Sequence, residues 1–296
     1  LVAAQADPDP DFPTVPFPNP EEAGALDMAI EQAREQGADL IIAVDPDADR
    51  CALAVPDPTS EMGWSPLSGD QIGSLLGEFL ASRGMKGSLA NSIVSSRLLS
   101  RIARAHGLDH HTTLTGFKWI ARAPGLGFGY EEAIGFCPDP AHVRDKDGIA
   151  TSVVAASLVA ALKAQGCSVW DELERLARLH GLHVSSPLTF RVEQIEQIAS
   201  GMARLRAQPP SVLAGSPVVE VSDLSQGYRG LPPTDGVLVL TEAGDRVIAR
   251  PSGTEPKLKC YLEVILPVAE GEPLPWEQAR ERLDSIKGAF AEIIGL

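Results

Sequence analysis

The sequence lacks several features that would assign it to a special class of protein. Its four cysteines lie far apart and form no CxxC pair, a spacing that favours reduced, buried thiols over a disulfide framework or a zinc site. No apolar run approaches the roughly 18 residues that a membrane span needs, and no secretory signal peptide is recognisable. We therefore expect a cytoplasmic protein with no membrane partner. The cysteines are Cys51, Cys137, Cys167 and Cys260.

Basic residues are also few relative to acidic ones. The chain has 25 Lys and Arg against 40 Asp and Glu, which gives a formal net charge of −15. Such a chain would not neutralise the phosphates of a nucleic acid, so no nucleic-acid partner is expected. A small phosphorylated ligand remains compatible, because a few local cations suffice to bind it. The 296 residues, 44% hydrophobic and 22% charged, are otherwise typical of a globular protein of two or three domains.

Strand and helix patterns alternate up to about residue 183, which indicates an α/β layer architecture. Asn19 and Gly37 are expected to bound the first helix, over residues 20–35. The apolar run at 39–44 predicts a buried parallel strand. The other elements expected here are strands at 51–55, 92–95, before Gly116 and up to 132, and helices at 68–83, 98–106, 116–122, 148–164 and 170–179.

Beyond residue 183 several adjacent strands are flanked by two helices, which is typical of a smaller α+β domain. We therefore predict two α/β layered domains, at residues 1–75 and 76–185, followed by an α+β C-terminal domain at residues 186–296. The elements expected in the last domain are strands at 188–192, 218–221, 236–241, 246–249 and 258–264 and helices at 193–206 and 276–294.

Three carboxylates, on Asp45, Asp47 and Asp49, alternate along a loop directly after an expected strand. Alternation brings them within reach of one point, and hard oxygen ligands at that density suit Mg²⁺ or Ca²⁺. The carboxyl end of a strand is also a common ligand site in α/β proteins. A solvated acidic turn is the alternative. An EF-hand is excluded, because its positions 6 and 12 would fall on Arg50 and Pro56.

Two further segments could contact a sugar phosphate. Glu131 and Glu132 lie between glycines, and adjacent carboxylates can accept hydrogen bonds from vicinal hydroxyls, although a solvated turn is equally compatible. Lys118 stands among apolar residues and could meet a phosphate or, if desolvated, take part in proton transfer. A surface lysine is the commoner outcome. The charged run at 144–148 precedes a helix and is expected to be a solvated helix start.

The segment from Arg250 to Lys257, Arg-Pro-Ser-Gly-Thr-Glu-Pro-Lys, lies between two expected strands. It combines a bidentate anion donor with two hydroxyls and a glycine that lets backbone N–H groups converge, which is the chemistry of a phosphate-binding loop. A plain polar hairpin is the alternative. The GxxxxGK[ST] spacing of a Walker loop is absent.

Together these four segments, in this order, resemble the α-D-phosphohexomutase family. Residues 45–50 are similar to its metal loop DGDxDR, with Pro46 in place of Gly, and residues 130–133 to its sugar loop GEESG, with Ala133 in place of Ser. The Glu-Glu-Ala-Ile-Gly form resembles the branch that contains phosphoglucomutases and phosphopentomutases. Residues 250–256 match the phosphate loop RxSGTxP, and residues 115–119 resemble the lysine-bearing loop.

The resemblance implies a four-domain isomerase that moves a phosphate between the 1- and 6-positions of a hexose. A phosphoserine would donate the phosphoryl group, through a bisphosphorylated sugar. The implied roles are Mg²⁺ ligation by Asp45, Asp47 and Asp49, lining of the active site by Arg50, phosphate contact or acid–base work by Lys118, sugar hydroxyl binding by Glu131 and Glu132, and binding of the second phosphate by Arg250, Ser252, Gly253 and Thr254.

One departure from the family pattern matters most. The nucleophile of the family lies in a Thr-(Ala/Ser)-Ser-His-(Asn/Asp)-Pro type of segment, and the sequence contains none. We therefore expect a truncated second domain, a sheet with an unpaired edge, and a missing N-terminal domain of the same protein as a partner. The chain alone is expected to have no mutase activity, and its metal affinity is expected to be weakened.

Three alternatives remain open at this point. A phosphopentomutase would act on ribose or deoxyribose phosphates, and the sugar loop does not distinguish it from a hexose enzyme. A non-catalytic sugar-phosphate-binding protein would use the same loops without turnover. A phosphatase of the aspartyl-nucleophile type would need Asp45 to become phosphorylated, but it usually has Thr or Val where Asp49 stands.

Overall fold

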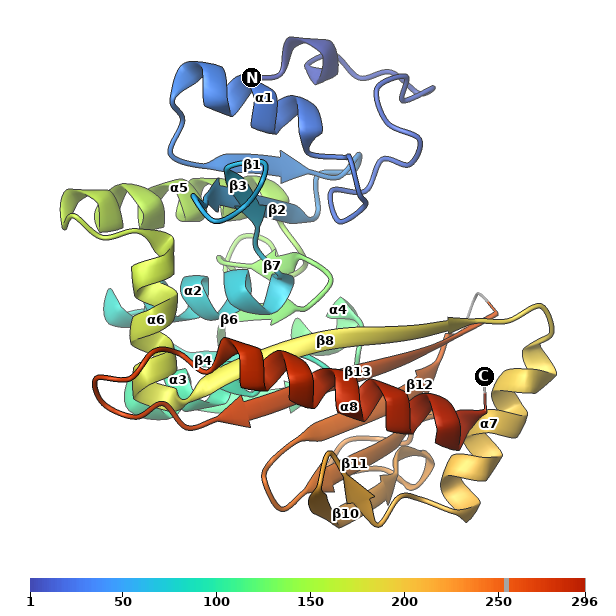
Figure 1. Ribbon diagram of the computed structural model, residues 1–296. Coiled ribbons are helices and arrows are strands. Elements are labelled where there is room, and N and C mark those ends of the chain that lie inside the picture. Colours follow the sequence, from blue (N-terminus) through green and yellow to red (C-terminus); the bar gives the residue numbers. More distant parts are fainter. Residues whose placement is uncertain (253–255, 296) are drawn as a thin grey trace. The chain divides into compact units, whose positions relative to one another are not determined.

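The computed structural model describes residues 1–252 and 256–295, which form two compact units (Figure 1). The N-terminal unit comprises Leu1–Ile93 and Leu99–Leu173, and the C-terminal unit comprises Val94–Leu98 and Glu174–Leu296. The domain boundaries near residues 75 and 185 stay predictions.

The first long helix begins later than the sequence predicts. After the short 3₁₀ turn η1 (Ala3–Gln5), helix α1 spans Asp27–Gln36. The Asn19 side chain accepts a hydrogen bond from the Glu21 amide at 3.0 Å, but turns follow, and Gly24 has a φ of +83°. The predicted helix start near residue 20 is therefore wrong. The end is correct, because Gly37 closes the helix in the left-handed region at a φ of +61°.

The strand predicted at 39–44 is neither parallel nor fully buried. Strand β1 (Ile41–Val44) pairs antiparallel with β2 (Cys51–Pro56), and β3 (Trp64–Pro66) pairs with β2 on its other side. The loop at 45–50 is too short for a crossover, so the two strands form a hairpin. Ile41 packs under α1, whereas Ile42 and Val44 are 38% and 44% exposed. Among the described strands β1 pairs with β2 alone, which leaves the expected unpaired edge.

A second sheet of the N-terminal unit has the strand order β5-β4-β6-β7. Strand β4 runs parallel to β5 and β6, and only β7 is antiparallel. The strand predicted at 92–95 is misplaced, because the chain turns at residues 93–95. The strands are β4 (Ser88–Ser92), β5 (His110–Thr113), β6 (Leu126–Glu131) and β7 (Gly135–Cys137), and the helices are α2 (Gly69–Ser82), α3 (Leu98–Ala105), α4 (Phe117–Ile120), α5 (Gly148–Ala164) and α6 (Val169–His180).

The C-terminal unit is built on a six-stranded antiparallel sheet of order β8-β13-β12-β11-β10-β9. Alternate residues of its strands form one core with the apolar faces of two helices, α7 and α8. This is the predicted α+β arrangement. The elements are β8 (Leu182–Arg191), α7 (Ile195–Ala207), β9 (Val212–Leu213), β10 (Ser216–Asp223), η2 (Leu224–Gln226), β11 (Val237–Thr241), β12 (Arg246–Pro251), β13 (Lys257–Leu266) and α8 (Trp276–Ile294).

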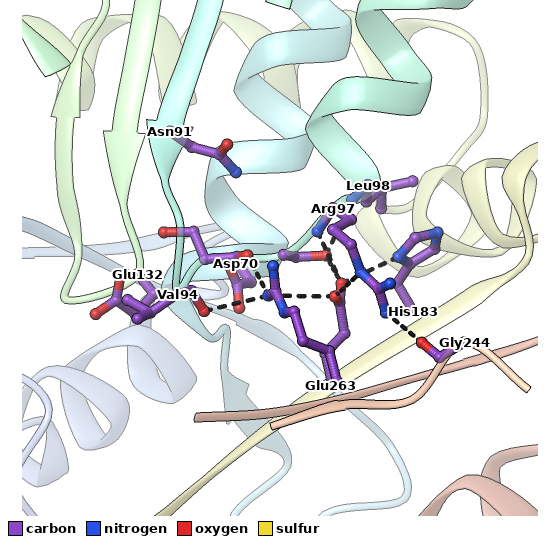
Figure 2. Close-up of polar contacts among 12 residues, drawn as sticks. Asp70, Asn91, Val94, Arg97, Leu98, Glu132, His183, Gly244 and Glu263 are labelled. Carbon is purple, nitrogen blue, oxygen red and sulfur yellow. Dashed lines mark hydrogen bonds and ion pairs between the residues drawn. The ribbon is translucent and has the colours of Figure 1, made fainter. Parts of the chain in front are cut away.

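The opposite face of this sheet holds a buried charge cluster (Figure 2). Glu263 of β13 is 1% exposed and accepts hydrogen bonds from Ser96 Oγ at 2.7 Å and from Arg97 Nε at 2.6 Å. His183 Nδ1 lies 3.2 Å from the same carboxylate, as does an Arg246 guanidinium nitrogen. These contacts bind residues 94–98 to the sheet. Residues 94–98 therefore belong to the C-terminal unit, although the segments directly before and after them belong to the N-terminal unit.

The cysteines agree with the predicted burial at three of their four positions. All four cysteines are free; Cys51, Cys137 and Cys260 are buried as predicted, but Cys167 is exposed. Burial raises the pKa of Cys51 to about 11 and the pKa of Cys260 to about 12. Among the described residues no single helix has the length and apolar character of a membrane span; α5 and α6 satisfy that test only as a pair bent by 89°.

Candidate functional site

The aspartate loop, residues 45–50, joins β1 to β2. One carboxylate oxygen from each of Asp45, Asp47 and Asp49 lies within 4.8 Å of the other two. The Arg50 amide donates to Asp45 Oδ1 at 2.9 Å, and Arg50 Nε lies 3.8 Å from both Asp45 and Asp49. Burial raises the pKa of Asp45, and the neighbouring carboxylates raise it further. Three converging oxygens that repel one another are a donor set that fits a hard divalent cation.

The glutamate loop, residues 131–135, follows β6. Glu131 is the last residue of β6 and is buried, and Glu132 Oε2 accepts a hydrogen bond from Ser92 Oγ at 3.1 Å. Ser92 ends the neighbouring parallel strand β4, so these side chains lie at the carboxyl edge of the sheet, where α/β proteins bind ligands. Burial and the charge of Glu132 raise the pKa of Glu131 to about 7. The pair can therefore both donate and accept hydrogen bonds near neutral pH.

Backbone contacts fix the aspartate loop, the glutamate loop and the start of α5 together. The Cys51 amide donates to the Ile134 carbonyl at 3.0 Å, and the Gly148 amide donates to the Ala48 carbonyl at 3.0 Å. Ile134 and Ala48 both have a positive φ, +52° and +57°, which is uncommon for residues with a side chain. Such strain persists only where the surroundings hold it in place, and it concentrates at functional sites.

Lys146 joins this cluster, although no sequence motif indicated it. Its Nζ lies 2.9 Å from Asp49 Oδ2, and its side chain is 16% exposed. The side chain runs past Gly135, where a Cβ would lie 2.4 Å from Lys146 Cδ. The run at 144–148 was expected to be solvated, and for Lys146 that expectation is wrong. The partner is distant in the sequence, so no local pattern could have revealed the pair.

Lys118 lies in the short helix α4 and is exposed to solvent rather than desolvated. Its Nζ is 6.0 Å from the centre of the Trp119 ring. None of the contacts found among the described residues joins it to the aspartate loop or the glutamate loop. The neighbouring Phe117 ring, in contrast, lies 5.7 Å from Lys146 Nζ. The predicted role of Lys118 therefore stays a prediction.

The predicted phosphate loop lies in the C-terminal unit, between β12 and β13. Arg250 is near the end of β12 and half-buried, and the Ser252 amide donates to the Lys257 carbonyl at 2.9 Å. That hydrogen bond closes the hairpin. The other two predicted phosphate ligands, Gly253 and Thr254, lie outside the described residues.

Strand register adds positive charge beside this hairpin. Lys259 is the direct partner of Arg250, and Arg191 of β8 is the partner of Lys257. Directly paired residues of an antiparallel sheet point to the same face, so the four cations share one face of the sheet. In a chain of net charge −15 this local concentration suits an anion. Of these four cations only Arg250 was predicted to bind an anion, because the register of β8 with β13 could not be known from the sequence.

Sequence profiles of the phosphoglucomutase/phosphomannomutase family match the chain in three consecutive stretches. The alpha/beta/alpha domain II matches residues 1–59, the alpha/beta/alpha domain III residues 68–178, and the C-terminal domain residues 190–274. Together these stretches cover most of the chain. Their order is the order in which the three domains are numbered.

Curated relatives carry names of three sugar-phosphate mutases. A Haemophilus influenzae protein named "Probable phosphomannomutase" is 46% identical, over 89% of this chain and 54% of its own length. A Staphylococcus aureus phosphoglucomutase is 34% identical, over 90% of this chain and 52% of its own length. The Mus musculus phosphopentomutase is 33% identical, over 98% of this chain and 52% of its own length. The chain thus spans about half the length of the curated relatives it matches.

Solved structures show the same fold at low sequence identity. The open form of the Paramecium phosphoglucomutase pp63/parafusin matches with a TM-score of 0.68 and 19% identity, over 95% of this chain and 51% of its own. A phosphoglucomutase/phosphomannomutase family protein from Burkholderia thailandensis matches with a TM-score of 0.67 and 18% identity, over 97% and 54%. The chain belongs to the phosphoglucomutase/phosphomannomutase family and carries three of its domains, II, III and IV.

Proposed function

We propose that this chain is the substrate-holding and metal-holding portion of a sugar-phosphate mutase that interconverts hexose 1-phosphates and 6-phosphates. One observation carries the proposal: backbone hydrogen bonds fix the aspartate loop against the glutamate loop and the start of α5. Three carboxylates that can hold a cation thereby lie beside two that can hold a sugar. The names of the relatives support a sugar-phosphate mutase, which is an isomerase.

Asp45, Asp47 and Asp49 would hold Mg²⁺, because their oxygens converge and no softer ligand lies among them. When bound, the ion would neutralise negative charge on the transferred phosphoryl group. Arg50 would orient that group, since its own backbone is fixed by the bond from its amide to Asp45. The metal and the role of Arg50 are proposals from the donor set and the loop geometry.

Glu131 and Glu132 would bind hydroxyl groups of the sugar. Glu132 is oriented by Ser92, and the raised pKa of Glu131 lets a neutral carboxyl donate a hydrogen bond while its neighbour accepts one. Lys118, exposed on α4, would contact a phosphate or move a proton. This arrangement suits a substrate that presents vicinal hydroxyls in more than one orientation.

Arg250 and Ser252, with Gly253 and Thr254, would bind the phosphate that is not transferred. Arg250 shares its sheet face with Lys257 and Lys259, so the hairpin offers several cationic donors to one anion. The sugar phosphate is the partner that this chemistry fits.

The phosphoryl donor would be a phosphoserine in an N-terminal domain of the same protein, acting through a sugar bisphosphate in the cytoplasm. The printed sequence has no Ser-His-(Asn/Asp)-Pro segment, so the 296-residue chain alone should not convert glucose 1-phosphate. A coupled assay with glucose 1,6-bisphosphate and Mg²⁺, run beside the S. aureus phosphoglucomutase, tests this. Sustained turnover by the chain, or phosphate release from it, contradicts the proposal.

A phosphopentomutase is the second candidate, because the mouse enzyme of that name aligns with 98% of this chain. The same glutamate loop would then bind ribose or deoxyribose hydroxyls. Comparing kcat/KM for hexose and pentose phosphates in the intact protein separates the two functions. A kcat/KM that is higher for the pentose phosphate by about tenfold or more would favour the phosphopentomutase.

A further inference from the structure

Lys146 is the one side chain of the 144–148 run that enters the cluster of loops described above. Its ammonium group lies 2.9 Å from Asp49 Oδ2, against 3.9 Å from Asp145 in its own segment. The pair is mostly shielded, with side-chain exposures of 16% for Lys146 and 31% for Asp49. A cation therefore occupies one of the three carboxylates that would hold the metal.

We infer that Lys146 is an exchangeable internal counter-ion of the aspartate loop, which holds Asp49 while no divalent cation is bound and releases it to one that binds. The inference rests on the proposed metal site. It assigns to this lysine a positioning role that neither the sequence motifs nor the names of the relatives specify.

The contacts of Lys146 favour exchange over a permanent bond. Among the described residues, the ammonium group forms one short ion pair, with Asp49, and it lies 5.7 Å from the centre of the Phe117 ring. The stem of the side chain lies along Gly135, where an added Cβ would be 2.4 Å from Lys146 Cδ and 3.0 Å from Glu131 Cγ. Because Gly135 has no side chain, the stem of Lys146 and the side chain of Glu131 lie next to each other on this side of the glycine.

Glu131 is the natural second partner. It is buried at the end of β6, and the charges of Lys146 and Arg50 attract its carboxylate. A cation that takes Asp49 would repel the ammonium group, and Glu131, whose Cγ lies beside Gly135 as the lysine stem does, would then accept it. Binding of a divalent cation to the aspartate loop would thus add positive charge to the glutamate loop. Metal binding would then be coupled to the charge of the site proposed for the sugar.

The test is the affinity of the 296-residue chain for Mn²⁺, measured by electron paramagnetic resonance, with Mg²⁺ as competitor. Removing a competing cation in Lys146→Met should tighten binding about three- to tenfold, whereas Lys146→Arg should stay within about twofold of the unmodified chain. Lys163→Met is the matched control, because Lys163 forms a surface ion pair with Asp39 at 2.6 Å. It should leave the affinity unchanged. Unchanged or weaker binding by Lys146→Met overturns the inference.

Thermal unfolding gives a second readout, because a purely structural lysine would change the unfolding temperature equally with and without Mg²⁺. Without divalent cation, Lys146→Met should unfold at a lower temperature than the unmodified chain, and saturating Mg²⁺ should abolish that difference. A difference that persists in Mg²⁺ overturns the exchange. If neither the unmodified chain nor Lys146→Met binds Mn²⁺, and Asp47→Asn does not alter that result, both the proposed metal site and the inference fail. If the unmodified chain binds Mn²⁺ but Lys146→Met does not bind it more tightly, only the inference is overturned.

Discussion

At the scale of single residues, Glu263 is a buried ionisable group of the C-terminal unit, with 1% of its surface exposed. Burial alone would raise its pKa, but the charge of Arg246, the hydrogen bond from His183 and the charge of Arg97 hold that pKa well below its ordinary value. The carboxylate is therefore ionised in the folded chain. It binds residues 94–98 to β13 through three donors, Ser96 Oγ and the amide and Nε of Arg97, and it also contacts His183 of β8.

Replacing Glu263 by Gln should lower the free energy of unfolding at pH 7 by about 3–5 kcal/mol, because two arginines lose a buried counter-charge. Urea unfolding measures this loss. Glu281→Gln is the control, since Glu281 is exposed on α8 and should change stability by less than about 0.5 kcal/mol. A loss for Glu263→Gln no larger than that of the control contradicts the account.

The same carboxylate predicts a pH dependence. Its folded pKa lies below the ordinary value of 4.5, so its contribution is complete above that value and is lost as the pH falls through the folded pKa. Urea unfolding of the unmodified chain should therefore lose stability below about pH 4.5, and Glu263→Gln should lose less over the same range. Parallel pH profiles for the two chains contradict this assignment.

At the scale of elements, the N-terminus of α5 bears directly on the aspartate loop. A Cβ on Gly148 would lie 2.4 Å from the Arg50 carbonyl oxygen and 2.7 Å from that of Ala48. Both atoms belong to the backbone of the loop, so no side-chain rotation relieves the clash. Only glycine lets helix and loop approach this closely.

Gly148→Ala should therefore destabilise the chain by about 1–3 kcal/mol and weaken Mn²⁺ binding, because the loop must shift. Gly288→Ala in α8 is the matched control: no atom lies within 4 Å of its added Cβ, and it should stabilise the chain by about 0.5–1 kcal/mol. Urea unfolding and Mn²⁺ titration of both variants measure these effects. Equal behaviour of the two variants contradicts the packing argument.

Elements whose limits are set by local chemistry were predictable from the sequence. Helix α5 spans Gly148–Ala164 as expected, because Asp147 caps it through a hydrogen bond to the Ala150 amide at 2.8 Å. The pairing of β1 was not predictable, since a short apolar run does not distinguish a parallel central strand from a hairpin strand. The placement of β4 was wrong by a few residues for a similar reason: apolar residues continue into the turn at 93–95.

The candidate site was predictable where its residues are adjacent in the chain and not where they are distant. Asp45, Asp47 and Asp49 converge as their alternation suggested. Lys146 and Ser92 were missed, because each reaches its carboxylate partner only through the fold. Close spacing in sequence fixes the first kind of contact, whereas the second depends on tertiary packing.

At the scale of the whole molecule, the chain carries three domains of its family and spans about half the length of the curated relatives it matches. The carboxylate-rich loops lie in the N-terminal unit and the cationic hairpin lies in the C-terminal unit. The proposed function therefore requires that the chain binds a sugar phosphate.

Isothermal titration calorimetry of the chain with glucose 1-phosphate, in saturating Mg²⁺, measures this binding. The account predicts saturable binding that Glu132→Gln weakens by about tenfold or more, the value of one hydrogen bond to a charged group, and that Glu281→Gln leaves unchanged. No saturable binding, or binding that Glu132→Gln does not weaken, would contradict the account.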